Sequence, residues 1–555
     1  MKVWVVDFET NNSDKAIETG QTHVWLWDLC EMESFKHQTG RTIKGFFEFL
    51  EKLPSCTIYS HNLKFDGSFI LDYLLLKANF KWVNDTPKAL KNNELCTLID
   101  AKKVYYQIAV KINNRTYKFR DSCKKIPGTV RSIAESWKLP ILKGEIDYRA
   151  NREEDYIATD EEIAYIRNDT EIIARVMKEL YAEGMISMTA SSDSYQAYIK
   201  SIGESTYNAF FPELKIELDD YIRKSYNGGV CFVNDKFKER ELENVKCYDV
   251  NSMYPSIMVS KLLPYGKPIF MEGKYQENEV YPLYIQHVFV YFKLKKGFFP
   301  SIMKKGFRIF TKNEYIEDTD GVMLEMWLTS VDMELLFKHY DVLDIEYVDY
   351  LMFKGSTNLF KGYIFPLYDI KCHEKGAKKQ LAKLKLNSLY GKFATNPHRT
   401  IIEPYEENGK VEYRVLDAYI DKTIYTAIST FVTAYARQKL FNAIEENHDI
   451  FVYCDTDSIH TIGEAKGLEV DKSKIGAWDL EKEYRYFKVL AQKTYYGELE
   501  DGTTIIKACG CPEDSKKLLN KDNFNFGTSV SGKLRPVHVK GGVVLVETNF
   551  TLQKR

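Results

Sequence analysis

The chain of 555 residues is too long for a single hydrophobic core, so about two to four domains are expected. Hydrophobic residues make up 44% and charged residues 28%, as in a soluble globular protein, and no apolar run approaches membrane-spanning length. The net charge of −2 excludes a uniformly basic nucleic-acid-binding protein, so the location of charge is more informative than its sum.

In the first third, carboxylates recur at spacings that suit metal-assisted hydrolysis. Residues 2–6 form a buried-strand pattern that leads into two acids with i, i+2 spacing, and two later acids lie on predicted helices. The acids are Asp7, Glu9, Asp66 and Asp169, with Asn62 and Tyr165 one helical turn before the last two. Four acids can hold two divalent ions that activate a water for phosphodiester hydrolysis. A surface charge would explain any one acid equally well, so only the set predicts a site.

Two charged residues between these motifs are further candidates. Lys143 would contact the scissile phosphate and Glu145 would complete the metal shell. An ordinary surface position explains both equally well, because long charged side chains are mostly exposed.

The middle of the chain contains a glycine-rich loop, Tyr226–Gly229. Gly228 and Gly229 would let backbone N–H groups approach a phosphate, although a plain hairpin turn explains the pattern nearly as well.

Three more acids are predicted to meet at the ends of neighbouring strands. A strand ends at Asp249, and an acidic turn carries Asp455 and Asp457, whose Cα atoms lie roughly 7 Å apart on an extended chain. Such a group would bind two Mg²⁺ ions in the geometry of in-line phosphoryl transfer. A solvated turn is the alternative for the 455–457 stretch alone.

A strongly basic segment lies between these acids. Residues 353–399 contain ten Lys or Arg residues and two acids, and residues 374–394 have a helical pattern. Lys379, Lys383 and Tyr390 fall within about 60° of arc on that helix, a face suited to a triphosphate and a base. An amphipathic surface helix is the alternative.

Later in the chain, Lys493 and Tyr495 place a cation and a ring two residues apart, which suits a primer strand. The ten cysteines are scattered, and Cys509 with Cys511 lacks a second pair for a zinc site. Reduced intracellular thiols are therefore expected.

Taken in order, these motifs resemble those of a known family. The N-terminal set resembles the three exonuclease motifs of proofreading DNA polymerases of the DEDDy type. The pattern DxxSxYP from Asp249, Kx₃NSxYG from Lys383, YxDTDS from Tyr453 and KxY from Lys493 resemble family B DNA polymerase motifs. Length and spacing are most similar to the protein-primed replicative polymerases of small Bacillus phages.

The resemblance implies an α/β and α+β multidomain fold. An RNase H-like 3′–5′ exonuclease domain is expected over 1–187 and a right-hand polymerase domain over 188–555. Within the latter, the expected parts are an insertion at 261–361, fingers at 362–394, an insertion at 396–422, palm to about 528 and a thumb at 529–555.

The resemblance also implies residue roles. Polymerase metals would be held by Asp249, Val250, Asp455 and Asp457, and exonuclease metals by Asp7, Glu145 and Asp169, with Glu9, Asp66 and Tyr165 also catalytic. Nucleotide contacts would be Tyr254, Lys371, Lys379, Lys383 and Tyr390, with Tyr254 excluding a ribose 2′-hydroxyl. DNA and primer contacts would be Asn62, Ser122, Lys143, Tyr148, Tyr226, Gly228, Gly229, Ser252, Gly391, Lys493 and Tyr495. Terminal-protein contacts would be Tyr59, His61 and Phe69. The sequence departs from the family at Cys123 and Gly128, in the loop that contacts primer and terminal protein.

The implied function is DNA-directed DNA synthesis that starts on a terminal-protein hydroxyl, proceeds with strand displacement and is proofread. Two Mg²⁺ or Mn²⁺ ions are expected at each site. The expected partners are template and primer DNA, dNTPs and the terminal protein, for a monomer without membrane association in the cytoplasm of a phage host. Two alternatives are a family B polymerase that extends an ordinary nucleic-acid primer and a DNA-binding exonuclease with an inert polymerase half.

Overall fold

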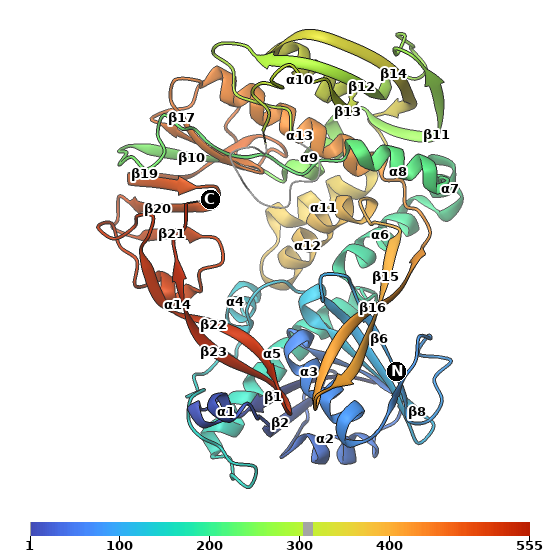
Figure 1. Ribbon diagram of the computed structural model, residues 1–555, viewed down its shortest axis with the longest axis vertical. Helices are drawn as coiled ribbons and strands as arrows, with labels where there is room; N and C mark the ends of the chain where they lie inside the picture. The colour runs from blue at the N-terminus through green and yellow to red at the C-terminus, as the bar shows by residue number, and fades with distance from the viewer. Residues whose placement is uncertain (1, 304–314, 555) are drawn as a thin grey trace.

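The N-terminal part of the computed structural model, which describes residues 2–303 and 315–554, is an eight-stranded mixed sheet with strand order β3-β2-β1-β4-β8-β7-β6-β5. Its strands are β1 (Lys2–Thr10), β2 (Val24–Glu31), β3 (His37–Gly40), β4 (Cys56–Ser60), β5 (Lys81–Trp82), β6 (Glu94–Ile99), β7 (Tyr105–Ile112) and β8 (Arg115–Asp121). The accompanying helices are α1 (Asp14–Thr19), α2 (Ile43–Leu50), α3 (Leu63–Asp72, continued by a π-helical turn over Tyr73–Lys77), α4 (Val130–Trp137) and α5 (Asp160–Ala182), and a 3₁₀ turn spans Ser122–Lys124. The sheet lies at the lower end of the molecule in Figure 1.

Strand β1 separates two cores because its side chains alternate between the faces of the sheet. Val3 and Val5 are buried with residues of α4 and α5, whereas Trp4, Val6 and Phe8 are buried with residues of α2 and α3. Asp7 and Glu9 continue the first series and therefore point toward α5. The strand runs through both acids to Thr10, beyond the expected end near residue 6.

The second large sheet has seven strands in the order β21-β20-β19-β10-β18-β17-β9. They are β9 (Cys231–Val233), β10 (Val245–Val250), β17 (Phe451–Asp455), β18 (Ser458–Ile462), β19 (Trp478–Ala491), β20 (Thr494–Leu499) and β21 (Thr504–Ala508). Helices α9 (Met253–Ser260) and α13 (Ala427–Glu446) share a buried cluster with one face of this sheet, and α13 is buried along nearly its whole length.

The helices around this sheet include α6 (Ala190–Ile202), α7 (Glu204–Phe210), α8 (Ile216–Ser225), α11 (Lys361–His373), α12 (Gly376–Phe393) and α14 (Glu513–Lys516). Helices α11 and α12 lie between the two large sheets in Figure 1. Among the described residues, no helix combines the length and apolar character that a membrane crossing requires.

Three smaller β units extend from the second sheet. A four-stranded sheet has the order β11-β14-β12-β13 and packs with α10 (Ser330–His339). Its strands are β11 (Leu263–Glu272), β12 (Leu283–Leu294), β13 (Leu324–Thr329) and β14 (Tyr340–Ser356). It occupies the expected insertion at 261–361, of which residues 304–314 lie outside the described residues. The other two units are hairpins, β15 (His398–Glu407) with β16 (Lys410–Ile420) and β22 (Ser529–Val539) with β23 (Gly542–Thr551).

Both hairpins reach the N-terminal domain, as Figure 1 shows. The Tyr413 hydroxyl on β16 hydrogen-bonds that of Tyr105 on β7. At the tip of the last hairpin, the N–H of Lys540 donates to the carbonyl of Gly20 at 3.1 Å. Gly541 has a φ of +91°, and a side chain there would collide with the carbonyl oxygen of Thr22. The expected α/β and α+β multidomain fold is confirmed, and the chain's last hairpin closes against its first domain.

Candidate active sites

The pairing of two antiparallel strands brings Asp249 to the acidic turn. Asp249 on β10 lies opposite Ser458 on β18, directly after the turn that carries Asp455 and Asp457. The N–H of Val250 donates to the carbonyl of Asp457 at 2.8 Å, which fixes the register at the strand end. The sequence prediction that these acids meet is therefore confirmed.

Burial and mutual repulsion perturb these carboxylates. Burial, followed by the charges of Asp457 and Glu481, raises the pKa of Asp249 to about 7. Burial and the charge of Asp455 raise the pKa of Asp457 to about 6. The Lys493 ammonium forms an ion pair with Asp455. A bound cation would relieve the remaining repulsion.

Helices α11 and α12 bring three lysines close to these acids. The Lys371 ammonium donates to the Ser252 hydroxyl at 2.8 Å. The pKa of Lys371 is lowered, chiefly by burial and also by the positive charges of Lys383 and Lys379. The nearby Asp249 carboxylate offsets part of this lowering. Lys379 and Lys383 are exposed, as the predicted face of the helix requires. The three cations are therefore candidates to bind an anionic ligand beside the carboxylates.

Two tyrosine rings and the Tyr226–Gly229 loop lie near the acidic turn. The rings of Tyr254 on α9 and Tyr390 on α12 lie 4.0 Å apart between centroids. A side chain at Gly229 would come within 3.2 Å of both Thr456 and the Tyr254 hydroxyl, so the loop runs close to the acidic turn. The loop connects α8 to β9 and is not a hairpin turn. By contrast, a side chain at Gly228 or Gly391 would meet no neighbouring atom within 4 Å.

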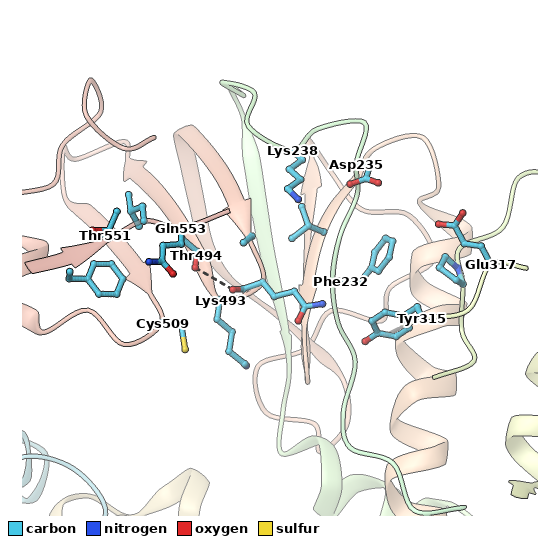
Figure 2. A pocket seen from close by; sticks show the side chains of 16 residues that line it. Phe232, Asp235, Lys238, Tyr315, Glu317, Lys493, Thr494, Cys509, Thr551 and Gln553 are labelled. Carbon is cyan, nitrogen blue, oxygen red and sulfur yellow. Dashed lines mark hydrogen bonds between the residues drawn. The ribbon is translucent and has the colours of Figure 1, made fainter. Parts of the chain in front are cut away.

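The lysine–tyrosine motif lies at the turn between β19 and β20. The backbone N–H of Lys493 donates to the Tyr453 hydroxyl at 3.1 Å, and the nearly buried Tyr495 ring lies 5.8 Å from the Tyr453 ring. Figure 2 shows a pocket of about 110 Å³ beside Lys493, lined also by Phe232, Tyr315 and the C-terminal residues 550–553. Lys493 and Cys509 also line the larger pocket that contains Asp249, Asp455 and Asp457, so the two pockets adjoin each other.

The carboxylates of the first third form a second cluster. Burial raises the pKa of Glu9 to about 8 and that of Asp66 to about 7, and it raises the pKa of Asp169 as well. The pKa of Asp7 is raised well above its usual value by burial and by the charges of Asp66, Glu9 and Asp169. These mutual effects show that β1, α3 and α5 bring the four acids together.

A lysine and two tyrosines complete this cluster. Lys143 forms an ion pair with Asp169, and its ammonium lies 5.1 Å from the centroid of the Tyr165 ring. The hydroxyls of Tyr165 and Tyr148 are 2.7 Å apart. Tyr165 and Asp169 were predicted from their spacing, Lys143 was a candidate that a surface position explained equally well, and Tyr148 was implied by the family resemblance.

The donor sets of both clusters fit hard divalent cations, which prefer carboxylate oxygens. Among the described residues, Asp66 and Asp169 each keep one buried oxygen without a hydrogen-bond partner. Within the same residues, no three His, Cys, Asp or Glu side chains already converge as ligands of one ion do.

Several predicted contacts lie elsewhere than expected. The Glu145 side chain is 88% exposed and lies 3.4 Å from Arg131, so it does not join the acidic cluster. Tyr59 is buried in the N-terminal domain, and Phe69 is buried between that domain and the β22–β23 hairpin, so neither exposes surface to a protein partner in this structure. Ser122 is also buried, and its hydroxyl bonds the His61 ring at 2.8 Å. The neighbouring Asn62 is exposed, and His61 is partly exposed.

Sequence reasoning missed two acids of the second sheet. Asp479 on β19 is the direct partner of Asp249 on β10, and one of its carboxylate oxygens has no hydrogen-bond partner among the described residues. Glu481 lines the same space of about 660 Å³ as Asp249, Asp455 and Asp457. The i, i+2 spacing of Asp479 and Glu481 is the signal that would have found them.

Comparisons with known proteins agree with this geometry. The family "DNA polymerase type B, organellar and viral" matches residues 52–161 and 150–473. The chain is 39% identical to the DNA polymerase of Bacillus phage B103, with each chain fully covered. It is also 39% identical to that of Bacillus phage phi29, over all of this chain and 99% of the relative.

Solved structures of the phi29 DNA polymerase share the whole fold. The complex with primer-template DNA superposes with a TM-score of 0.93 at 37% identity, and both chains are fully covered. The ternary complex with primer-template DNA and incoming nucleotides gives a TM-score of 0.92 at 38% identity, again with full coverage.

Proposed function

The chain belongs to the type B DNA polymerases of organelles and viruses and is a DNA-directed DNA polymerase, and we propose that its two acidic clusters are separate sites for synthesis and proofreading. The observation that carries the proposal is the pairing of β10 with β18, which sets Asp249 beside Asp455 and Asp457 near three lysines.

At the synthesis site, Asp249 and Asp457 would hold divalent ions, with Asp455 beside them and the Val250 carbonyl assisting. Two bound Mg²⁺ or Mn²⁺ ions would stabilise both the attacking 3′-oxygen and the leaving oxygen of an in-line displacement. Lys371, Lys379 and Lys383 neutralise the triphosphate. The ion pair between Lys493 and Asp455 supports a role for Lys493 at the primer terminus, since its ammonium lies next to the reacting groups.

The remaining residues of this site orient the substrates. Tyr254 supports the sugar and excludes a 2′-hydroxyl, and Tyr390 contacts the nascent base pair. Their rings are in contact, so they must separate when a base pair enters. Tyr226, Gly228, Gly229, Ser252, Gly391 and Tyr495 position template and primer.

At the proofreading site, Asp7, Glu9, Asp66 and Asp169 would hold divalent metal ions, which would supply an activated water for 3′–5′ hydrolysis. Tyr165 orients this water, Lys143 contacts the scissile phosphate, and Asn62 and Tyr148 hold the primer strand. The raised pKa values of the four acids support this role, because perturbed carboxylates in one cluster are typical of a metal-dependent site.

The proposed domain boundary separates the two sites. The exonuclease domain is 1–187, which ends between α5 and α6, and the polymerase domain is 188–555. The fingers are 362–394 and the thumb is 529–555. The insertions at 261–361 and 396–422 enclose DNA and provide strand displacement and processivity, which the contact between Tyr413 and Tyr105 supports.

Synthesis starts on the hydroxyl of a terminal protein, and the enzyme acts as a monomer in the cytoplasm of a phage host. Two features support initiation on a terminal protein. The chain is 38–39% identical to Bacillus phage polymerases over its full length, and it has a sheet and a hairpin in the segments proposed as insertions, 261–361 and 396–422. Of the three residues expected to contact the terminal protein, His61 is the one with exposed surface. Extension of an ordinary primer is the second candidate. An inert polymerase half is disfavoured because all three carboxylates and the lysines are in place.

The test is incorporation of a labelled dNTP with Mg²⁺, with and without a candidate terminal protein. Covalent label on that protein is expected, and chelation should abolish it. Extension of DNA primers without any label on the protein would favour ordinary priming, while no incorporation in either case would overturn the synthesis site.

A further inference from the structure

The side of α12 away from its lysines is buried against the N-terminal domain. Leu381 is 5% exposed and belongs to the same apolar cluster as Ile133, Ala134 and Trp137 of α4. Ala377 and Leu384, at the edges of that face, pack against the cluster as well. The proposed nucleotide-binding helix therefore rests on a helix of the proposed exonuclease domain.

Polar contacts flank this apolar contact on both sides. The Gln380 amide donates to the backbone carbonyl of Ser136 at 3.1 Å, immediately before Trp137. One turn further along α12, Lys385 forms an ion pair of 2.9 Å with Glu183, just after α5. The position of α12 relative to α4 is thus fixed both along and across the helix axis.

The cationic side of α12 cannot fix that position by itself. Lys379 and Lys383 carry the same charge as Lys371 on α11, so the cationic sides of the two helices do not attract each other. The first turn of α12 also lacks a capping side chain, because Lys375 makes no side-chain cap hydrogen bond. Tertiary contacts therefore hold the helix: Leu386, Leu389 and Phe393 anchor its second half in the main core cluster, and Leu381 anchors its first half against α4.

We infer that the contact of Leu381 with α4 positions Lys379 and Lys383, so that the N-terminal domain sets the nucleotide affinity of the polymerase site. This inference rests on the proposed function of these lysines. Residues 379 and 383 are about 40° apart on a helix, and residue 381 lies about 160° from each of them, so a tilt that loosens Leu381 displaces both ammonium groups. Leu381 and Ile133 are positioning residues and do not touch the nucleotide.

The test combines one substitution on each side of the contact, Leu381→Ala and Ile133→Ala. Single-nucleotide extension should show a KM for the dNTP raised roughly threefold to tenfold, with kcat within about twofold. Degradation of single-stranded DNA by Ile133→Ala should stay at the wild-type rate, which shows that the N-terminal domain is folded. Leu381→Met, which conserves volume, should restore the wild-type KM.

Lys378→Ala serves as the matched control, because Lys378 is exposed on the same helix and pairs only weakly with Glu374 at 3.7 Å. Its KM should not change. Wild-type KM values for both Leu381→Ala and Ile133→Ala would overturn the inference. If Lys383→Ala still raised the KM in that case, the proposed nucleotide site would stand without the contribution of α4.

Discussion

The rings of Tyr254 and Tyr390 lie 4.0 Å apart, at 31° to each other, next to the strand end that carries Asp249. Tyr254 would face the sugar of an incoming nucleotide, where a bulky ring leaves no room for a 2′-hydroxyl. Replacing it with valine should raise ribonucleotide incorporation relative to deoxyribonucleotide by about tenfold or more. Tyr254→Phe keeps the ring and should keep the selectivity. Primer extension with matched rNTP and dNTP series would measure both, and equal selectivity of the valine variant would contradict the steric role.

The two acidic clusters should be separable by mutation. Asp457→Asn removes one charge from the synthesis site without changing side-chain size, and incorporation should fall at least about 100-fold. Hydrolysis of a single-stranded 3′ end should continue at the wild-type rate, because that reaction uses Asp7 and Glu9. The double variant Asp7→Ala with Glu9→Ala should show the reverse pattern. Loss of both activities in either folded protein would refute separate sites.

Lys493 is proposed to contact a primer phosphate as well as Asp455. Lys493→Ala should weaken primer-template binding to a similar extent for every sequence. It should also reduce the slope of log affinity against log salt concentration by about one, because one phosphate contact is lost. Gel-shift titrations between low and moderate KCl would measure this slope. Lys474→Ala, an exposed lysine paired with Glu469, should keep the wild-type slope.

The exonuclease carboxylates predict a pH dependence of stability. The pKa of Glu9 is raised to about 8 and that of Asp66 to about 7, chiefly by burial, so the folded protein binds protons that the unfolded chain releases near pH 4–5. The protonated carboxyls contribute fully to the free energy of unfolding below the pKa values of the unfolded chain. This contribution is lost as the pH rises through the pKa values of the folded protein. In a chelator, the melting temperature should therefore fall between about pH 5 and 8.

The matched variant for this experiment is Glu9→Gln with Asp66→Asn, which should show a smaller fall over the same range. Mg²⁺ should offset the fall in the wild type, and more strongly at higher pH, since the ion binds the deprotonated carboxylates. Thermal melts at several pH values would measure both effects. Identical pH profiles for the variant and the wild type would contradict the proposed burial of these charges.

Much of the site could be predicted from the sequence because its signals are local. Two acids at i, i+2 point to one side of a strand wherever that strand lies, which identified Asp7 with Glu9. The same spacing pointed to Asp455 and Asp457, although Asp457 lies in the turn between β17 and β18 and the two acids do not share an extended strand. The periodicity of residues 374–394 likewise defines a helix, α12, and the side of it that carries lysines. These features depend only on neighbouring residues.

The remaining features depend on pairing between distant segments, which spacing does not reveal. Asp479 comes to lie opposite Asp249 only because β19 lies beside β10. Tyr59 and Phe69 were expected to contact a partner, but Tyr59 is buried because β4 is a central strand, and Phe69 is buried because the β22–β23 hairpin covers α3. Glu145 turns away from the acids toward Arg131. The packing of Leu381 on α4 also joins segments far apart in the sequence.

The hydrogen bond from Lys540 to Gly20 bears on how the protein matures during translation. The N-terminal domain emerges from the ribosome before the β22–β23 hairpin, so its Gly20–Thr22 edge gains this partner only when the hairpin has been synthesised. A nascent chain therefore leaves that edge uncovered until the hairpin folds against it.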